Sequence, residues 1–477
     1  MMRSLFSGVS GLKNHQTRMD VIGNNISNVN TTGFKSSRVN FEDSLSQTLT
    51  AASQASGTTG GTNPKQIGLG SRISAIDVNF KDGSVQSTGI NTDLCLSGNA
   101  LFVVQQGNQT FYTRNGAFNF DADGNLVNAE GLYVQGYMNA SATEHKTINT
   151  NGSTSSIQVR AGKTMPSAKT EKANYINNLN SSAATITGIT ATRKNGTQEP
   201  ITDSVTVGDD GSANPYIAAV LTMSDGTTQT VTSGTYTTTH SIPLSTTVKI
   251  YDSLGTAHVV PITVEKTAAN TWVAKLAKDK ITEEDGSYTE LSMSEATIKF
   301  KNTGAFESGS ASLNLKYYDK ADTATRKETA APQTVPITFD NLTQYANSST
   351  INAEADGYAS GTLDTVTIDE SGTVIGTYTN GVLRKEAQIA VAQFTNAPGL
   401  TKKGNSLYVE SQNSGVPNIG TAEGFGATIT ASALEMSNVD VAEEFSNMII
   451  TQRGFQSNSK IITVSDEMLE NLINMKR

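Results

Sequence analysis

The chain has 477 residues, a formal net charge of −9 and only 17% charged residues. The acidic balance argues against nucleic-acid partners, which need basic patches, and the absence of a run of about 18 apolar residues argues against membrane insertion. A chain of this length predicts about three compact units with terminal segments rather than one domain.

The N-terminal residues 1–35 predict an amphipathic helix over roughly residues 4–29, with Gly33 as its C-terminal stop. Apolar residues recur at alternating steps of four and three, as in the seam of a heptad repeat, and Gln16 and Gly23 are its weak members. The seam is Leu5, Val9, Leu12, Gln16, Met19, Gly23 and Ile26, widened by Phe6, Ile22 and Val29.

The next residues change character twice. Residues 36–70 are largely small, polar and weakly charged, which is typical of a linker that orders on assembly. From Ser71 onward apolar and polar residues alternate, and turns such as Asn115-Gly116 are typical of β-hairpins. This region, residues 71–145, predicts part of an inner β domain.

Residues 146–335 are rich in Thr and predict an outer β insertion, long enough for two small β domains. From about Pro336 the sequence returns to the character of residues 71–145. We therefore assign residues 336–430 to the same inner β domain, interrupted by the outer one.

The C-terminal residues 431–477 repeat the helical design, and Asp440 with Glu443 has the spacing of a capping box. Because the two apolar stripes exceed one narrow seam, we expect them to pack against further copies; the alternative is a two-helix stem that merely closes the molecule. The fold class we predict is mainly β with terminal α-helices, paired antiparallel like a coiled coil. The C-terminal seam is Val441, Phe445, Met448, Gln452, Phe455, Ser459, Ile462, Asp466, Leu469 and Ile473, extended sideways by Ile450, Ile461, Met468 and Leu472.

No motif supports catalysis, and we expect no metal and no cofactor. Gly162-Lys163-Thr164 resembles the end of a phosphate loop, but Ile157 stands where the loop needs glycine. The turn at Asp121 lacks the glycine of a calcium loop, since Leu126 takes its sixth position. We expect Cys95 to be buried and to pack as a small apolar residue. The histidines lie in four separate segments: His15, His145, His240 and His258.

Two longer motifs carry a family resemblance. Residues 20–28 (DVIGNNISN) and 32–35 (TGFK) closely resemble the N-terminal signature of flagellar axial proteins, a family of rod, hook and hook-associated subunits. Three segments near the other end resemble the C-terminal signature of the same family: residues 437–440 (SNVD), 452–453 (QR) and 456–458 (QSN). Segments typical of hook subunits are YDSLG, GYASG and GNSLY, which begin at Tyr251, Gly357 and Gly404.

The resemblance implies a subunit of a helical homopolymer outside the cell: a curved hollow hook that acts as a universal joint and transmits motor torque to the filament. It implies passage through the flagellar export apparatus without a cleaved signal peptide. The implied partners are other copies, the hook cap, the distal rod and the hook–filament junction proteins. A distal rod subunit and, from another class, a secreted β-rich adhesin are the alternatives.

From the heptad spacing and the signatures together we predict an assembly interface on the two terminal helices. Its N-terminal members are Leu5, Val9, Leu12, Met19, Ile22, Asn24, Asn25, Ile26 and Asn28. Its C-terminal members are Val441, Phe445, Met448, Gln452, Phe455, Ile462, Leu469 and Ile473.

Overall fold

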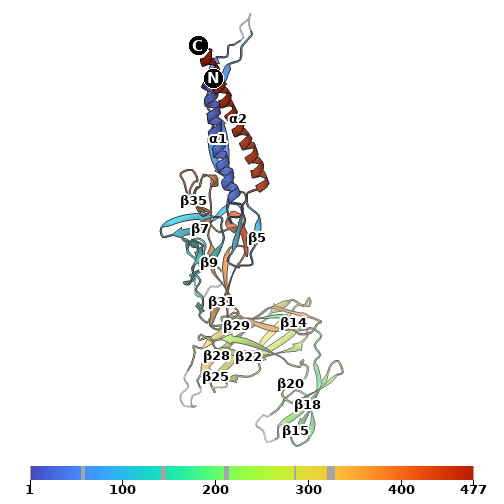
Figure 1. Ribbon diagram of the computed structural model, residues 1–477. Coiled ribbons are helices and arrows are strands. Elements are labelled where there is room, and N and C mark those ends of the chain that lie inside the picture. Colours follow the sequence, from blue (N-terminus) through green and yellow to red (C-terminus); the bar gives the residue numbers. More distant parts are fainter. Residues whose placement is uncertain are drawn as a thin grey trace. The chain divides into compact units, whose positions relative to one another are not determined.

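The computed structural model describes residues 2–54, 60–140, 147–208, 214–283, 286–319 and 328–475. The chain divides into two compact units, Met1–Lys163 with Leu363–Arg477 (unit 1) and Thr164–Thr362 (unit 2) (Figure 1). The predicted insertion of residues 146–335 therefore starts too early and ends too early. Residues 336–362 stay in unit 2 because strand β29 (Gln333–Tyr345) pairs with β28 (Ser310–Tyr318) and, in parallel, with β14 (Ala173–Asn180).

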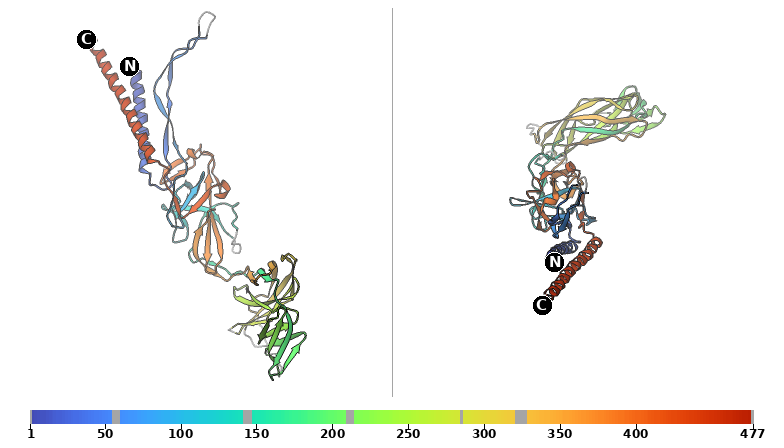
Figure 2. Two further views of the ribbon diagram at one scale, coloured as in Figure 1. Left: turned by 90° about the vertical axis from the view of Figure 1, so that its right-hand side faces the viewer. Right: turned by 90° about the horizontal axis from the view of Figure 1, so that it is seen from above.

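Two helices of unit 1 pack side by side and form a stem (Figures 1 and 2). Helix α1 spans Met2–Ser27 and α2 spans Val441–Asn474. They are antiparallel, since Arg18 donates to Asn447 and Asn25 donates to Glu444. This pairing confirms the predicted fold class of a mainly β chain with terminal helices.

The ends of both helices differ from the prediction. Helix α1 ends at Ser27, before Gly33. Gly33 instead adopts a positive φ of 65° and lies close to the backbone of Asn115. Helix α2 starts at Val441, directly after the predicted cap Asp440, so the first residues of the assigned region 431–477 are not helical; residues 428–431 and 433–435 form short strands. Asp440 caps α2 by accepting from the N–H groups of Ala442 and Glu443 at 2.9 and 3.2 Å.

Residues 36–70, predicted as a linker, contain three strands, which form a narrow two-stranded ribbon together with the strand that follows them. Strand β1 (Ser37–Asp43) pairs with β4 (Ser71–Val78), and β2 (Ser46–Thr50) pairs with β3 (Lys65–Gly68). The two strands satisfy each other's backbone groups, so a ribbon of small polar residues forms without a core. Residues 55–59 of this segment lie outside the described part.

The rest of unit 1 is built on a main sheet in the order β31-β32-β33-β11-β7-β8-β36-β35, with two small sheets that pair β6 with β38 and β5 with β39. Its core includes Leu94, Phe102, Phe118 and Ile389. Cys95 is buried in β6, as predicted, and burial raises the pKa of its thiol to about 11. The strands are β5 (Val85–Ser87), β6 (Leu94–Ser97), β7 (Ala100–Gln106), β8 (Gln109–Thr113), β9 (Phe118–Phe120), β10 (Leu126–Asn128), β11 (Tyr133–Met138), β12 (Ser155–Ser156), β31 (Gly361–Ile368), β32 (Thr373–Tyr378), β33 (Leu383–Ile389), β34 (Val391–Gln393), β35 (Thr401–Gly404), β36 (Leu407–Val409), β37 (Asn418–Gly420), β38 (Thr428–Ala431) and β39 (Ala433–Glu435), with 3₁₀ turns at Ala397–Gly399 and Glu423–Phe425.

Unit 2 contains two hydrophobic cores. The larger lies between the sheets β24-β25-β28-β29-β14-β30 and β21-β22-β23-β26-β27 and includes Tyr175, Trp272 and Phe339. The smaller belongs to the sheet β16-β15-β18-β17-β20, which the chain forms between β14 and β21. Besides β14, β28 and β29, the strands of unit 2 are β13 (Thr164–Met165), β15 (Ile186–Arg193), β16 (Gln198–Ile201), β17 (Ser204–Val207), β18 (Tyr216–Met223), β19 (Thr228–Val231), β20 (Gly234–Thr237), β21 (Leu244–Tyr251), β22 (Ala257–Ala268), β23 (Thr271–Leu276), β24 (Lys280–Thr282), β25 (Tyr288–Met293), β26 (Ala296–Phe300), β27 (Phe306–Ser308) and β30 (Asn352–Ala355).

Candidate assembly surface

The seam between α1 and α2 is formed largely by small and polar residues. A Cβ on Gly8 would lie 3.3 Å from the Ile462 side chain, and one on Gly454 would lie 2.7 Å from the His15 ring. Thr451 and Ser465 are the two buried residues of α2 among those the structure describes. Glycine lets the two backbones approach closely, so the pair closes with few large apolar side chains in its seam.

The α2 residues that face α1 lie one position before the predicted heptad seam. Their spacing of three and four is the one expected for a helix pair, but one residue rotates a helix by about 100°. The predicted apolar seam is therefore turned to one side of the face that meets α1, and of its residues Ile462 still lies against Gly8. The α1-facing residues are Glu444, Asn447, Thr451, Gly454, Asn458 and Ser465.

Large apolar side chains of α2 are exposed on both sides of this seam. At about 100° per residue they fall into two groups, one on each side. Phe445 is 50% exposed in the first group and Ile450 is 59% exposed in the second. We name the groups flank A, consisting of Val441, Phe445, Phe455 and Ile473, and flank B, consisting of Ile450, Ile461, Val464, Met468 and Leu472; Ile449 is exposed on the face opposite α1.

The structure separates the predicted interface residues into three sets. Ile22 and Asn25 are buried within the subunit. The exposed set is Val9, Asn24, Val441, Phe445, Gln452, Phe455 and Ile473. The half-buried set is Leu5, Leu12, Met19, Ile26, Asn28, Met448, Ile462 and Leu469.

Asn25 was predicted as part of an interface between copies, but in the structure it makes its contacts within one chain. Its Nδ2 donates to the Ser37 carbonyl and to Glu444 Oε1, both at 2.8 Å, and its Oδ1 accepts from the Ser37 N–H at 3.0 Å. Burial raises the pKa of Glu444, and the hydrogen bond from Asn25 opposes that rise. Asn25 thus ties α1 both to β1 and to α2.

The ribbon adds exposed apolar side chains that the heptad pattern missed. Every residue of β2 and β3 is exposed, including Leu49 and Ile67, and Leu45 beside them is 67% exposed. The sequence signal was three isolated apolar residues in a polar segment, which alone does not distinguish a linker from a ribbon.

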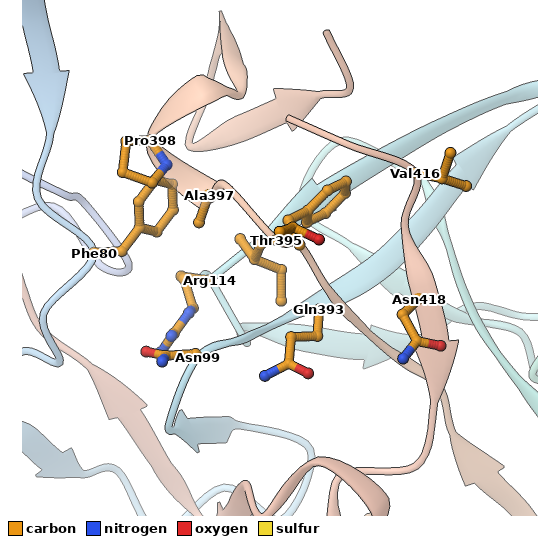
Figure 3. Close-up of a pocket in the computed structure, with 11 residues that line it drawn as sticks. Phe80, Asn99, Arg114, Gln393, Thr395, Ala397, Pro398, Val416 and Asn418 are labelled. Atoms are coloured by element: carbon orange, nitrogen blue, oxygen red, sulfur yellow. The ribbon is translucent and has the colours of Figure 1, made fainter. Parts of the chain in front are cut away.

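Unit 1 contains a pocket of about 510 Å³ (Figure 3). Arg114 is its one charged lining residue, and the Arg114 guanidinium is paired with Asp82 and Glu435. The remaining walls carry aromatic, aliphatic and neutral polar side chains, such as Phe80, Pro398 and Asn418. This arrangement offers no general acid–base pair to a substrate.

The described residues form neither a metal-ligand cluster nor a membrane-spanning helix. Across the described ranges, no three His, Cys, Asp or Glu side chains gather as a metal site would require. His15 packs on Phe41, whereas His240 and His258 belong to unit 2, and His145 lies outside the described residues. Neither described helix has a stretch both long and apolar enough to cross a bilayer.

Four family models match successive parts of the chain. Residues 5–35 match the flagella basal body rod protein model, and residues 95–162 match the flagellar hook protein FlgE/F/G D1 domain. Residues 223–358 match the flagellar basal body protein FlaE D2 domain. Residues 430–475 match the C-terminal model of flagellar basal body rod FlgEFG proteins.

Full-length relatives extend these matches over the whole chain. The chain is 37% identical over 508 residues to the flagellar hook protein FlgE of Treponema pallidum, and 38% identical over 500 residues to that of Borreliella burgdorferi. Each alignment covers 100% of both chains. The flagellar basal-body rod protein FlgG of Bacillus subtilis is 28% identical over 479 residues, again with full coverage. On this identity and coverage, the chain belongs to the flagellar hook protein family.

Proposed function

We propose that this chain polymerises as the structural subunit of a flagellar hook, a curved hollow tube that acts as a universal joint and transmits motor torque to the filament. The observation that carries the proposal is the exposure of flank A and flank B on both sides of α2. Since α1 already fills the seam between them, other copies must cover the flanks.

The free energy available from the flanks is large enough to drive assembly. Full burial of a Leu, Ile, Val, Phe or Met side chain contributes about 1.5–3 kcal/mol. The nine flank residues are already partly covered, so their remaining surface offers on the order of 10 kcal/mol per subunit before the entropic cost of association. Isolated helices are only marginally stable in water, so packing between copies also stabilises the helices of the stem.

The position of the flanks favours an open polymer over a closed dimer. Flank A and flank B are different surfaces on different sides of one helix. A contact that joins flank A of one copy to flank B of the next is heterologous, and heterologous contacts generate rings or helical filaments. A tube is the helical form of such a chain of contacts.

The face of α2 opposite α1 is polar along its C-terminal half. We assign this face to the water-filled interior of the tube, because it would be costly to bury between apolar flanks. Its exposed residues are Gln456, Lys460, Thr463, Glu467, Glu470 and Asn474.

The same proposal includes the partners and the location. Copies of the chain are the main partners, and the hook cap, the distal rod, the hook–filament junction proteins and the export apparatus are the others. The subunit leaves the cell through the flagellar export apparatus without a cleaved signal peptide and functions outside it. These points rest on the family, and the interface residues rest on the exposed flanks.

Two other functions are less well supported. A distal rod subunit agrees with the 28% identity to a rod protein, but the identity to the hook proteins of Treponema pallidum and Borreliella burgdorferi is 37–38%. A secreted adhesin accounts for the β-rich units but not for a stem with two exposed apolar flanks.

Electron microscopy of polymers grown from the purified full chain tests the proposal. A curved hollow tube is the expected product. A straight tube would instead favour the rod function, and a chain that stays monomeric at high concentration and high salt would contradict polymerisation.

A further inference from the structure

A group of charged side chains is buried where the stem meets the β domain of unit 1. We name Lys35, Asp82, Arg114 and Glu435 the junction cluster. Lys35 Nζ lies 2.6 Å from Glu435 Oε1, and Arg114 lies 3.3 Å from Glu435 Oε2 and 3.1 Å from Asp82 Oδ1. The side chains of Lys35, Arg114 and Glu435 are at most 1% exposed, whereas that of Asp82 is 44% exposed. Two positive and two negative charges balance.

The cluster joins both connections between the stem and the β domain. Lys35 follows α1, which ends at Ser27, and Glu435 precedes α2, which begins at Val441. Arg114 follows strand β8 of the β domain. One carboxylate therefore holds the chain leaving α1, the chain entering α2 and the sheet.

Backbone groups fix each charged side chain in one position. Lys35 Nζ also donates to the Lys81 carbonyl at 2.7 Å, and Arg114 donates to the carbonyls of Leu96 and Gly98. Glu435 Oε1 accepts from the Gly83 N–H at 2.8 Å. Burial lowers the pKa of Lys35 and the charge of Glu435 raises it, so the pair depends on mutual contact.

Neighbouring contacts repeat the same connection. Asn438 accepts from the Ser36 N–H at 2.8 Å and donates to the carbonyls of Asn79 and Lys81. The Gly33 N–H donates to the Glu435 carbonyl at 2.8 Å. Residues flanking both helices are thus bonded to one another and to the loop after β4.

We propose that the junction cluster is a positioning element that fixes the direction in which the stem leaves the β domain of unit 1, and that a regular polymer needs this fixed direction. The inference rests on the proposed function. Buried ion pairs add little stability relative to apolar replacements of similar size, but every misaligned geometry leaves a buried charge unpaired. Apolar side chains would tolerate a range of stem directions, since hydrophobic contact is not directional.

Spin labels on the stem and on the β domain measure this direction. Ser457 of α2 and Gln109 of β8 are exposed, and a cysteine at each position carries the labels, while buried Cys95 is checked to take none. The test variant K35M/R114M/E435M is compared with K163M/R384M/E386M. That control removes a second ion cluster of unit 1, in which Lys163 and Arg384 lie 2.6 and 3.6 Å from the fully buried Glu386.

We expect the triple variant to show a broader distance distribution and a loss of regular polymer, at a thermal stability close to that of the control. A distribution as narrow as that of the unmodified chain would overturn the proposal, and so would regular polymer from a variant with a broad distribution. If the triple variant does not fold, E435Q serves instead, because its amide cannot accept from both cations as the carboxylate does. Absence of polymer from the unmodified chain would overturn the proposed function, whereas the distance distribution still decides the positioning role.

Discussion

Gly11 of α1 lies directly against the side chain of Asn458 in α2, so closely that a Cβ atom on residue 11 would stand 2.6 Å from Asn458 Nδ2. Close approach at this point allows the small-residue seam to close. A larger residue at this position would have to displace the Asn458 side chain.

We therefore expect Gly11→Leu to separate the helix pair and destabilise the stem by about 1–3 kcal/mol, as overpacking does in protein cores. Hydrogen–deuterium exchange of α1 peptides measures the loss of protection. Gly23→Leu is the matched control, because a Cβ on Gly23 meets nothing within 4 Å. Leu favours the helix over Gly by about 0.8 kcal/mol, so by itself either substitution should strengthen α1. Equal loss of protection in both variants would therefore contradict the close-packed seam.

Flank A and flank B should both be needed for polymerisation. Phe455→Asp and Ile450→Asp each place a charge on one flank, and burying an unpaired carboxylate between copies is costly. We expect each variant to remain a folded monomer, with stability changed by no more than about 0.5 kcal/mol, because both positions are already partly exposed.

Sedimentation and electron microscopy follow tube formation in these variants. Gln456→Asp is the control, since Gln456 is exposed on the polar face of the same helix. Normal tubes from either flank variant would remove that flank from the interface.

Gly33 should be far less tolerant of a side chain than a glycine of similar backbone conformation. Gly33 and Gly131 have φ values of 65° and 78°, so Ala costs roughly 1–2 kcal/mol of backbone strain at either position. A Cβ on Gly33 would also lie 2.5 Å from the Asn115 amide nitrogen, whereas one on Gly131 meets nothing within 4 Å. We expect Gly33→Ala to destabilise unit 1 by about 1–3 kcal/mol more than Gly131→Ala.

The rate at which the Cys95 thiol reacts with a thiol reagent in urea reports on unit 1, because Cys95 is buried in β6. Trp272 fluorescence reports on unit 2 and should not change between the two variants. Equal urea midpoints for Gly33→Ala and Gly131→Ala would refute the tight contact with Asn115.

Glu444 should make the stem less stable as the pH rises. Burial raises its pKa above the ordinary value of 4.5, so the folded stem favours the protonated carboxyl. Its favourable contribution is complete below pH 4.5 and is lost as the pH rises through the raised pKa. Glu444→Gln keeps an oxygen that accepts from Asn25, so we expect this variant to be at least as stable as the unmodified chain at pH 7.

The difference in helix stability between the two chains, measured from pH 4 to pH 7, isolates Glu444 from the other carboxylates. It should grow with pH in favour of the Gln variant. A difference that stays constant, or one that favours the unmodified chain at pH 7, would show that the Asn25 hydrogen bond outweighs the burial of Glu444.

Much of the stem could be predicted from local sequence. Heptad spacing located both helices, and Asp440 marked the start of α2, because helical periodicity and capping depend on residues a few positions apart. The burial of Cys95 followed from its apolar surroundings. The segments around Asn25 and Gly33 indicated the family, but the sequence did not predict the contacts that these two residues make within the subunit.

Only the tertiary structure decided which face of α2 meets α1. The apolar pattern favoured the seam through Phe445 and Phe455, but Gly11 of α1 lies against Asn458, and the buried residues of α2 are Thr451 and Ser465. Spacing alone does not distinguish a contact within one chain from a contact between copies, because both use the same helical period. Likewise, β29 belongs to unit 2 through its parallel pairing with β14, more than 150 positions away in sequence, and no local pattern encodes such a partner.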